Sequence, residues 1–159
     1  MRSGPSLAAY QAVQRLAGDR WPALREELLA GLRGQTSLVP QAPVDIFLEE
    51  GLVDDAIGAL EASPAAFSNY VLVERVADAA TPTRPDWVIR TCQAQAERIM
   101  DAGKAPHYHH AVGWLSRVKT AYLAAGQAAE WRTYLSEVLA RHKRKYSLVP
   151  LLERLRAEA

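Results

Sequence analysis

The sequence predicts an all-α fold built from stacked antiparallel helical hairpins with a C-terminal capping helix. Apolar residues recur three or four positions apart through most of the 159 residues, which is the spacing of helices with one buried face. Glycines and prolines divide the chain where such helices are expected to end and begin. No convincing alternation of apolar and polar residues, the pattern of a half-buried strand, interrupts these stripes.

The first half of the sequence is predicted to form two hairpins with a polar segment between them. Gly18 separates the apolar stripes of the first hairpin, which are Leu7, Tyr10, Val13, Leu16 and Ala17, then Trp21, Leu24, Leu28 and Leu32. Residues 35–43 contain two prolines and form a candidate joint between sub-modules of a single domain over residues 1–159. Gly51 turns the second hairpin, whose stripes are Val44, Phe47 and Leu48, then Val53, Ala56, Ile57 and Leu60.

The third hairpin is expected between Pro64 and Gly103. Its first helix opens at Pro64 and carries Phe67, Tyr70, Val71, Val76 and Ala77. Its second helix follows a break at residues 81–85 and carries Val88, Ile89, Cys92, Ala96, Ile99 and Met100.

The fourth hairpin begins at Pro106 and turns at Gly126. It carries Ala111, Trp114, Leu115, Val118, Tyr122 and Ala125 before the turn, then Trp131, Tyr134, Leu135, Val138, Leu139 and His142. Trp114 and Trp131 are expected to face each other across this turn. A last helix starts near Ser147 and Pro150 and carries Leu148, Leu151, Leu152 and Leu155.

The spacing inside two hairpins predicts degenerate tetratricopeptide-like repeats. In that pattern a bulky residue is followed nine positions later by a small one and four later by a large apolar one, because two helices cross closely at the small residue. Phe47, Ala56 and Leu60 fit this spacing. Tyr122, Trp131 and Leu135 keep it but place a tryptophan in the small position, so a consensus array is not predicted.

Composition indicates a globular chain made for a reducing compartment. Nearly half of the residues are apolar (49%), enough for a sizeable core. The single Cys92 excludes an intramolecular disulfide and a multi-cysteine zinc site, which favours the cytoplasm. No run of 18 apolar residues occurs, so no membrane-spanning segment is predicted.

The sequence predicts no catalytic residue, no cofactor site and no enzyme activity. The carboxylate pairs Glu26-Glu27, Glu49-Glu50 and Asp54-Asp55 are neighbours in sequence, so on a helix they point in different directions. Cys92 lies on an inward stripe and is interpreted as a small core residue.

A histidine cluster offers weak metal-binding geometry. His107 and His110 would share a helix face beside His109, but no carboxylate stands close in the sequence. Surface histidines at a helix start are favoured, and no metal site is predicted.

Charge is distributed unevenly behind a formal net charge of +1. Residues 43–101 carry eleven acidic and four basic side chains, a net −7, whereas residues 102–159 carry four acidic and ten basic ones, a net +6. The basic run Arg141, Lys143, Arg144 and Lys145, with Tyr146 beside it, could contact phosphates and stack on a base. The same residues could instead complement the carbonyl end of a helix. Both interpretations stay open.

A longer pattern gives a family resemblance, best over about residues 85–157. It consists of His107-Tyr108, Ala111, Trp114-Leu115, Ala121-Tyr122, Gly126, Glu130-Trp131, Tyr134-Leu135, and the basic run before Leu148 and Pro150-Leu151-Leu152. This pattern resembles the C-terminal helical region of bacterial SWIM zinc-finger proteins. The zinc element of that family pairs Cys-x-Cys with Cys-x-His, and this chain has only Cys92. The resemblance therefore implies a helical repeat with an interaction role, and it implies no zinc site here.

Together these observations predict a non-catalytic protein–protein interaction module, either part of a larger protein or accessory to one. The expected partner is another protein, because stacked hairpins expose a long ridged surface without a deep pocket. The sequence does not indicate the identity of that protein. The alternative is an accessory domain that binds nucleic acid through the basic C-terminal third.

Overall fold

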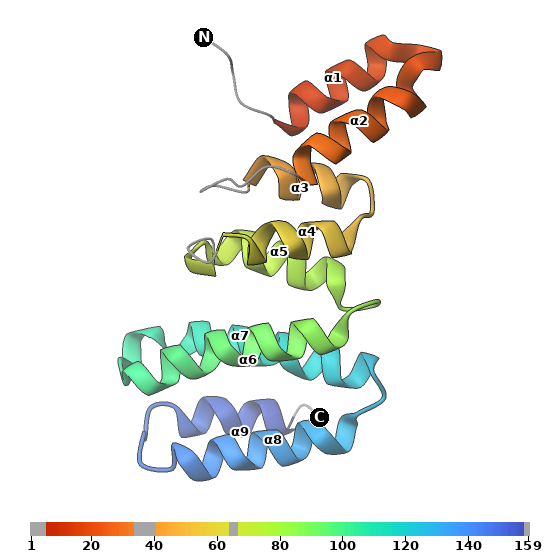
Figure 1. Ribbon diagram of the computed structural model, residues 1–159. Helices are drawn as coiled ribbons and strands as arrows, with labels where there is room; N and C mark the ends of the chain where they lie inside the picture. Colours follow the sequence, from red (N-terminus) through yellow and green to blue (C-terminus); the bar gives the residue numbers. More distant parts are fainter. Residues whose placement is uncertain (1–5, 34–40, 64–66, 158–159) are drawn as a thin grey trace. The chain divides into compact units, whose positions relative to one another are not determined.

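Every regular element that the structure describes is helical, which confirms the all-α class of the predicted fold (Figure 1). This computed structural model describes residues 6–33, 41–63 and 67–157. None of the described helices combines the length and apolar content needed to cross a bilayer. The chain divides into two compact units, Met1–Ala79 (unit 1) and Ala80–Ala159 (unit 2). The organisation as one domain stays a prediction.

Besides a short 3-10 turn at residues 67–68, unit 1 contains five α-helices and the 3-10 turn η1 among its described residues. They are α1 (Leu7–Ala17), η1 (Gly18–Arg20), α2 (Trp21–Arg33), α3 (Gln41–Glu49), α4 (Val53–Glu61) and α5 (Tyr70–Ala80), which ends at the unit boundary. Of the candidate joint at residues 35–43, residues 35–40 lie outside the described part, and Gln41 to Pro43 already belong to α3.

The second predicted hairpin is confirmed as α3 and α4, which pack together around a glycine turn. Gly51 adopts a positive φ of 71° and donates its N–H to the Leu48 carbonyl, while Leu52 donates to the Phe47 carbonyl at 2.8 Å. These two bonds are a Schellman motif, which satisfies the last carbonyls of a helix and favours glycine. Phe47, Ala56 and Leu60 are all buried, as their spacing predicts.

Two stripes in unit 1 were predicted only in part, because Tyr10 and Leu32 are buried but other members are exposed. Helix α1 buries Tyr10, but Val13 is 37% exposed and Leu16 is 87% exposed; on α2 Leu29 is buried and Leu28 is 37% exposed. Helix α3 packs against α1, so the outer apolar face of the hairpin stays open to solvent.

The start of α5 also differs from its predicted position. The helix begins at Tyr70, because the Asn69 side chain accepts a hydrogen bond from the Leu72 N–H at 3.2 Å and caps the first turn. Tyr70 and Val71 are consequently exposed, and Leu72 and Val73 are buried instead. Phe67 lies in a short 3-10 turn before the helix, and Pro64 falls outside the described residues.

Unit 2 consists of α6 (Pro85–Ala102), the 3-10 turn η3 (Ala105–His107), α7 (Tyr108–Ala124), α8 (Ala128–Arg141) and α9 (Val149–Ala157). Its most extensive helix packing joins α6 to α7, side by side in Figure 1, around Gly103 with its φ of 70°. The sequence pattern had assigned these two helices to different hairpins. Helix α7 also packs against α8, and α9 packs against both.

The turn between α7 and α8 positions the large aromatic residues of unit 2. Gly126 donates to the Leu123 carbonyl and Gln127 to the Tyr122 carbonyl, a second Schellman motif. Trp131 is buried and its ring lies 6.4 Å from that of Tyr122. Buried Trp114 stands eight residues before Tyr122, about 12 Å further along the helix. The expected pairing of Trp114 with Trp131 is therefore corrected to a pairing of Tyr122 with Trp131.

Candidate functional site

An apolar groove of about 280 Å³ runs between α1 and α2 in unit 1. The wall from α1 repeats at helical spacing, and Ile46 of α3 also lines the groove. The lining residues are the N-cap residue Ser6, then Ala9, Tyr10 and Val13 from α1, Glu27, Leu28, Gly31 and Leu32 from α2, and Ile46 from α3. Sequence reasoning missed this groove, because it assigned Val13 and Leu28 to the buried faces of the hairpin.

Small residues keep the groove open. A Cβ atom added to Gly31 would meet no other atom within 4 Å, so the backbone of α2 faces empty space there. Ala9 contributes only a methyl group to the opposite wall. The rings of Tyr10 and Trp21 meet edge to face at 5.1 Å and join α1 to the start of α2.

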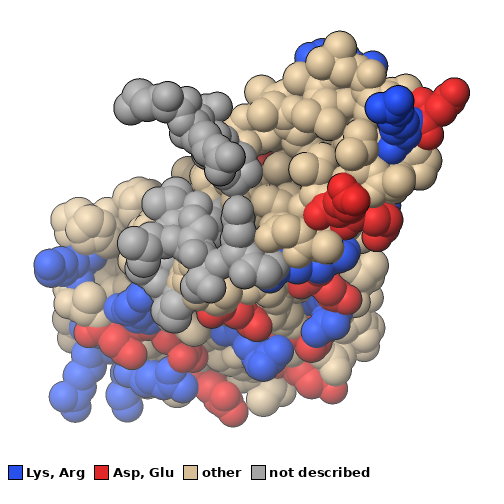
Figure 2. Space-filling model, turned by 45° about the horizontal axis from the view of Figure 1, so that its top comes forward, with Lys and Arg blue, Asp and Glu red and all other residues tan. Residues whose placement is uncertain are grey.

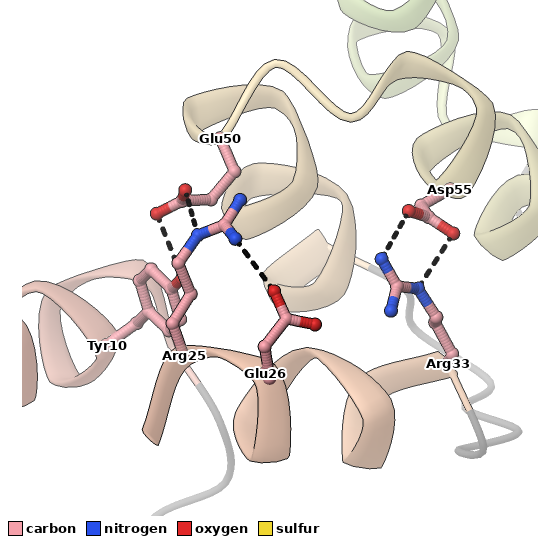
Figure 3. A network of polar contacts seen from close by, with 6 residues as sticks. All are labelled: Tyr10, Arg25, Glu26, Arg33, Glu50 and Asp55. Atoms are coloured by element: carbon pink, nitrogen blue, oxygen red, sulfur yellow. Dashed lines mark hydrogen bonds and ion pairs between the residues drawn. The ribbon is translucent and has the colours of Figure 1, made fainter. Parts of the chain in front are cut away.

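A polar network fixes these helices to α3 and α4 (Figure 3). Glu50 directly follows α3. Its carboxylate accepts a hydrogen bond from the Tyr10 hydroxyl at 2.9 Å and another from Arg25 Nε at 2.7 Å. At the other end of α2, Arg33 donates two bonds to Asp55, at 3.0 and 2.9 Å. Burial, then the hydrogen bond to Glu50, raises the pKa of Tyr10 to about 12, so this hydroxyl remains a donor at physiological pH.

Charge is sparse around the groove. Glu27 is its one charged lining residue, and Arg15 is the one charged residue of α1. Within the described part of the chain, neither of them forms a hydrogen bond or ion pair. In Figure 2 the surface over α1 and α2, at the upper right, is mainly uncharged (tan).

The four predicted nucleic-acid-binding residues divide into two pairs in unit 2. Arg141, the last residue of α8, contacts Glu97 of α6 at 3.4 Å, and the Lys145 ammonium donates to the Met100 carbonyl at 2.6 Å. Lys143 and Arg144 are exposed in the turn that follows α8. Tyr146 beside them is 84% exposed. Lys145 thus complements a carbonyl at the end of α6 rather than the carbonyl end of α8.

Polar side chains on α6 form hydrogen bonds with residues of α7 and α8. The Glu97 carboxylate accepts a hydrogen bond from the Tyr134 hydroxyl at 3.0 Å. One turn earlier, the Gln93 side-chain amide donates a hydrogen bond to the Tyr122 hydroxyl at 3.0 Å. Burial, followed by the nearby Glu97 carboxylate, raises the pKa of Tyr134. The i, i+4 spacing of Gln93 and Glu97 beside an apolar stripe is the sequence signal that could have identified this line of contacts.

His142 lies buried between these charges. It is 3% exposed, and neither of its ring nitrogens forms a hydrogen bond in the described structure. Its Nε2 is 3.8 Å from the Asp101 carboxylate. Burial and the Lys145 charge lower the pKa of His142 despite that carboxylate, so the ring is neutral at physiological pH. The predicted inward position of His142 is confirmed.

The other candidate residues from the sequence are the histidine cluster, Cys92 and the carboxylate pairs. The rings of His107 and His110 lie 6.2 Å apart, and Cys92 is buried in unit 2. Among the described residues no three His, Cys, Asp or Glu side chains come together in a way that could hold a metal ion. Of the carboxylate pairs, Glu50 and Asp55 anchor arginines of α2.

Comparison with known proteins does not assign the chain to a family. No protein-family model, curated protein or solved structure matches the chain. The resemblance to the helical region of SWIM zinc-finger proteins therefore stays a hypothesis drawn from the sequence pattern.

Proposed function

We propose that this chain is a non-catalytic protein-binding module, and that the groove between α1 and α2 is its binding surface. The observation that supports this function is the unfilled apolar groove, held open by Gly31 and flanked by exposed Val13 and Leu28. Contiguous exposed apolar surface is characteristic of sites that another protein covers.

The size and chemistry of the groove favour a helix over a small molecule. Small-molecule sites measure about 300–1,000 Å³ and carry several convergent polar groups. At about 280 Å³ this groove falls just below that range, and its polar side chains are Ser6, Tyr10 and Glu27. Two helices with an apolar channel between them match the helix-in-groove mode, in which apolar residues of a third helix fill the channel.

The tetratricopeptide-like arrangement belongs to the same proposal. In unit 1 the pair α3 and α4 supports it through buried Phe47, Ala56 and Leu60, and in unit 2 the packing of α6 on α7 and of α8 on α9 has the form of successive hairpins. Such arrays present helix surfaces to partners rather than enclosed pockets.

Nucleic-acid binding is the second candidate. It is supported by the exposed trio Lys143, Arg144 and Tyr146. Protein binding is preferred because Arg141 and Lys145 are engaged with α6, which leaves fewer cations for phosphate contacts.

The test uses a variant that fills the groove from its own wall. Gly31→Leu places a side chain in the open space, and Gly31→Ala at the same position changes helix propensity while leaving most of the groove empty. A pull-down on immobilised protein should retain a protein partner with wild type and Gly31→Ala, after nuclease treatment, and lose it with Gly31→Leu. Equal retention by all three proteins, or retention that nuclease abolishes, would reject the groove as the binding surface.

A further inference from the structure

Helix α1 carries an apolar surface that extends beyond the groove wall. Ala9, Ala12, Val13 and Leu16 follow one another at spacings of three, one and three residues, which places them on one side of the helix. Leu16 at the end of this stripe is the most exposed large apolar residue in the described structure.

This stripe has the properties that the groove requires of an occupant. The groove is lined by small and medium apolar side chains and needs a helix whose own side chains are small to medium. The stripe of α1 is composed of alanine, valine and leucine. The groove and the stripe share Ala9 and Val13, so they are adjacent parts of one surface.

The charges at this surface are complementary. Arg15 borders the stripe one turn after Ala12, and it is the only charged residue of α1. Glu27 lines the groove, and both side chains lack partners among the described residues. An incoming helix with one basic residue beside its apolar stripe would give Glu27 an ion pair.

We propose that the occupant of the groove is α1 of a second copy of this chain, so that two α1–α2 hairpins form a four-helix bundle. This inference rests on the proposed function and names the partner as the chain itself. In a two-fold dimer one patch meets the same patch on the other copy, so each groove receives one α1. Arg15 of each copy then pairs with Glu27 of the partner copy, and the contact occurs twice.

The dimer is expected to be weak. Helix α1 has 11 residues and is about 17 Å long, so the bundle buries an area near or below the lower end of the usual range of about 1,200–2,000 Å². Interfaces of that size are typical of transient association, and we expect a dissociation constant on the order of 10–100 µM.

The first experiment is sedimentation velocity on the full chain across that concentration range. Wild type and Gly31→Ala should show a reversible monomer–dimer equilibrium, and Gly31→Leu should weaken it by at least about tenfold because its side chain occupies the groove. Circular dichroism confirms that each variant keeps its helical content. A monomer at every concentration, or a dimer that Gly31→Leu leaves unchanged, would overturn the proposal.

The second experiment tests the two charged contacts. Arg15→Glu and Glu27→Arg should each weaken the homodimer about fivefold or more, because each creates two like-charge contacts. An equimolar mixture of the two variants should form a heterodimer, since every contact then joins opposite charges. Labelled Arg15→Glu titrated with unlabelled Glu27→Arg measures this by fluorescence anisotropy. A mixture no tighter than either variant alone would contradict the proposed pairing.

The two proposals fail in distinguishable ways. A monomeric chain that captures a different protein, with loss of capture in Gly31→Leu, would refute self-association and leave the protein-binding function standing. A chain that neither dimerises nor captures a protein would refute both.

Discussion

At the scale of single residues, His142 shows how a polar side chain is accommodated in the interior of unit 2. Its ring is buried without a hydrogen bond, and Arg141, Lys145, Glu97 and Asp101 surround it. An unpartnered buried polar group typically costs about 1–3 kcal/mol. The neutral ring is tolerated because only the charged form bears the full desolvation penalty.

The lowered pKa of His142 makes stability depend on pH. The unfolded chain binds the proton near the ordinary pKa of 6.5, and the folded chain binds it only at lower pH, so the stability contribution is complete above 6.5 and falls as the pH drops toward the folded pKa. We expect the melting temperature of wild type to decrease between about pH 7 and pH 5. The decrease should be smaller in His142→Leu. Parallel profiles for wild type and His142→Leu would contradict this.

Truncation to alanine is expected to affect the free energy of unfolding very differently at Trp131 and at Leu16. Trp131 is 1% exposed and packs against Tyr122 and Tyr134, so Trp131→Ala should lower the free energy of unfolding by about 3–5 kcal/mol. Leu16 is exposed, so Leu16→Ala should change it by less than about 0.5 kcal/mol at concentrations where the chain is monomeric. Urea denaturation measures both. A large loss for Leu16→Ala in the monomer would show that α1 is packed on its outer face.

At the scale of helices, two glycines have different roles. Gly126 occupies a turn with a φ of 73°, a conformation that strains any residue with a Cβ. Gly31 sits within α2, where a Cβ is tolerated.

Alanine substitution should therefore change stability in opposite directions at these two positions. Gly31→Ala should raise the free energy of unfolding by up to about 1 kcal/mol, because alanine is the better helix former. Gly126→Ala should lower it by about 1–2 kcal/mol through the positive φ. The comparison is made by urea denaturation. Stabilisation by Gly126→Ala would mean that the turn adopts another geometry.

At the scale of the whole molecule, the basic run connects stability with the alternative function. Arg141 and Lys145 hold α8 and the following turn to α6, whereas Lys143 and Arg144 face solvent. A structural role and a phosphate-binding role therefore fall on different residues and can be separated by substitution.

Two paired variants should separate these roles. Arg141→Gln with Lys145→Gln should lower the free energy of unfolding by about 1–2 kcal/mol, and Lys143→Gln with Arg144→Gln should leave it unchanged. On the preferred function, RNA and DNA bind wild type only weakly at physiological salt. Sub-micromolar affinity that Lys143→Gln with Arg144→Gln abolishes, with a flatter salt dependence, would favour the nucleic-acid alternative.

Sequence alone determined the helical class, the turns at Gly51, Gly103 and Gly126, and buried positions such as Phe47, Trp131 and His142. These features follow from local rules: the helical period selects a buried face, and a positive φ selects glycine.

Tertiary structure alone decided which apolar stripes are covered. Val13, Leu16 and Leu28 satisfy the same helical period as buried residues, yet they remain exposed because no described helix lies against that face of the α1–α2 hairpin. The use of Arg141 and Lys145 to hold α6 likewise depends on contacts between residues 44 and 45 positions apart in sequence. Periodicity specifies a face for burial, but the partner of that face is fixed by long-range packing, and the candidate site lies where that partner is missing.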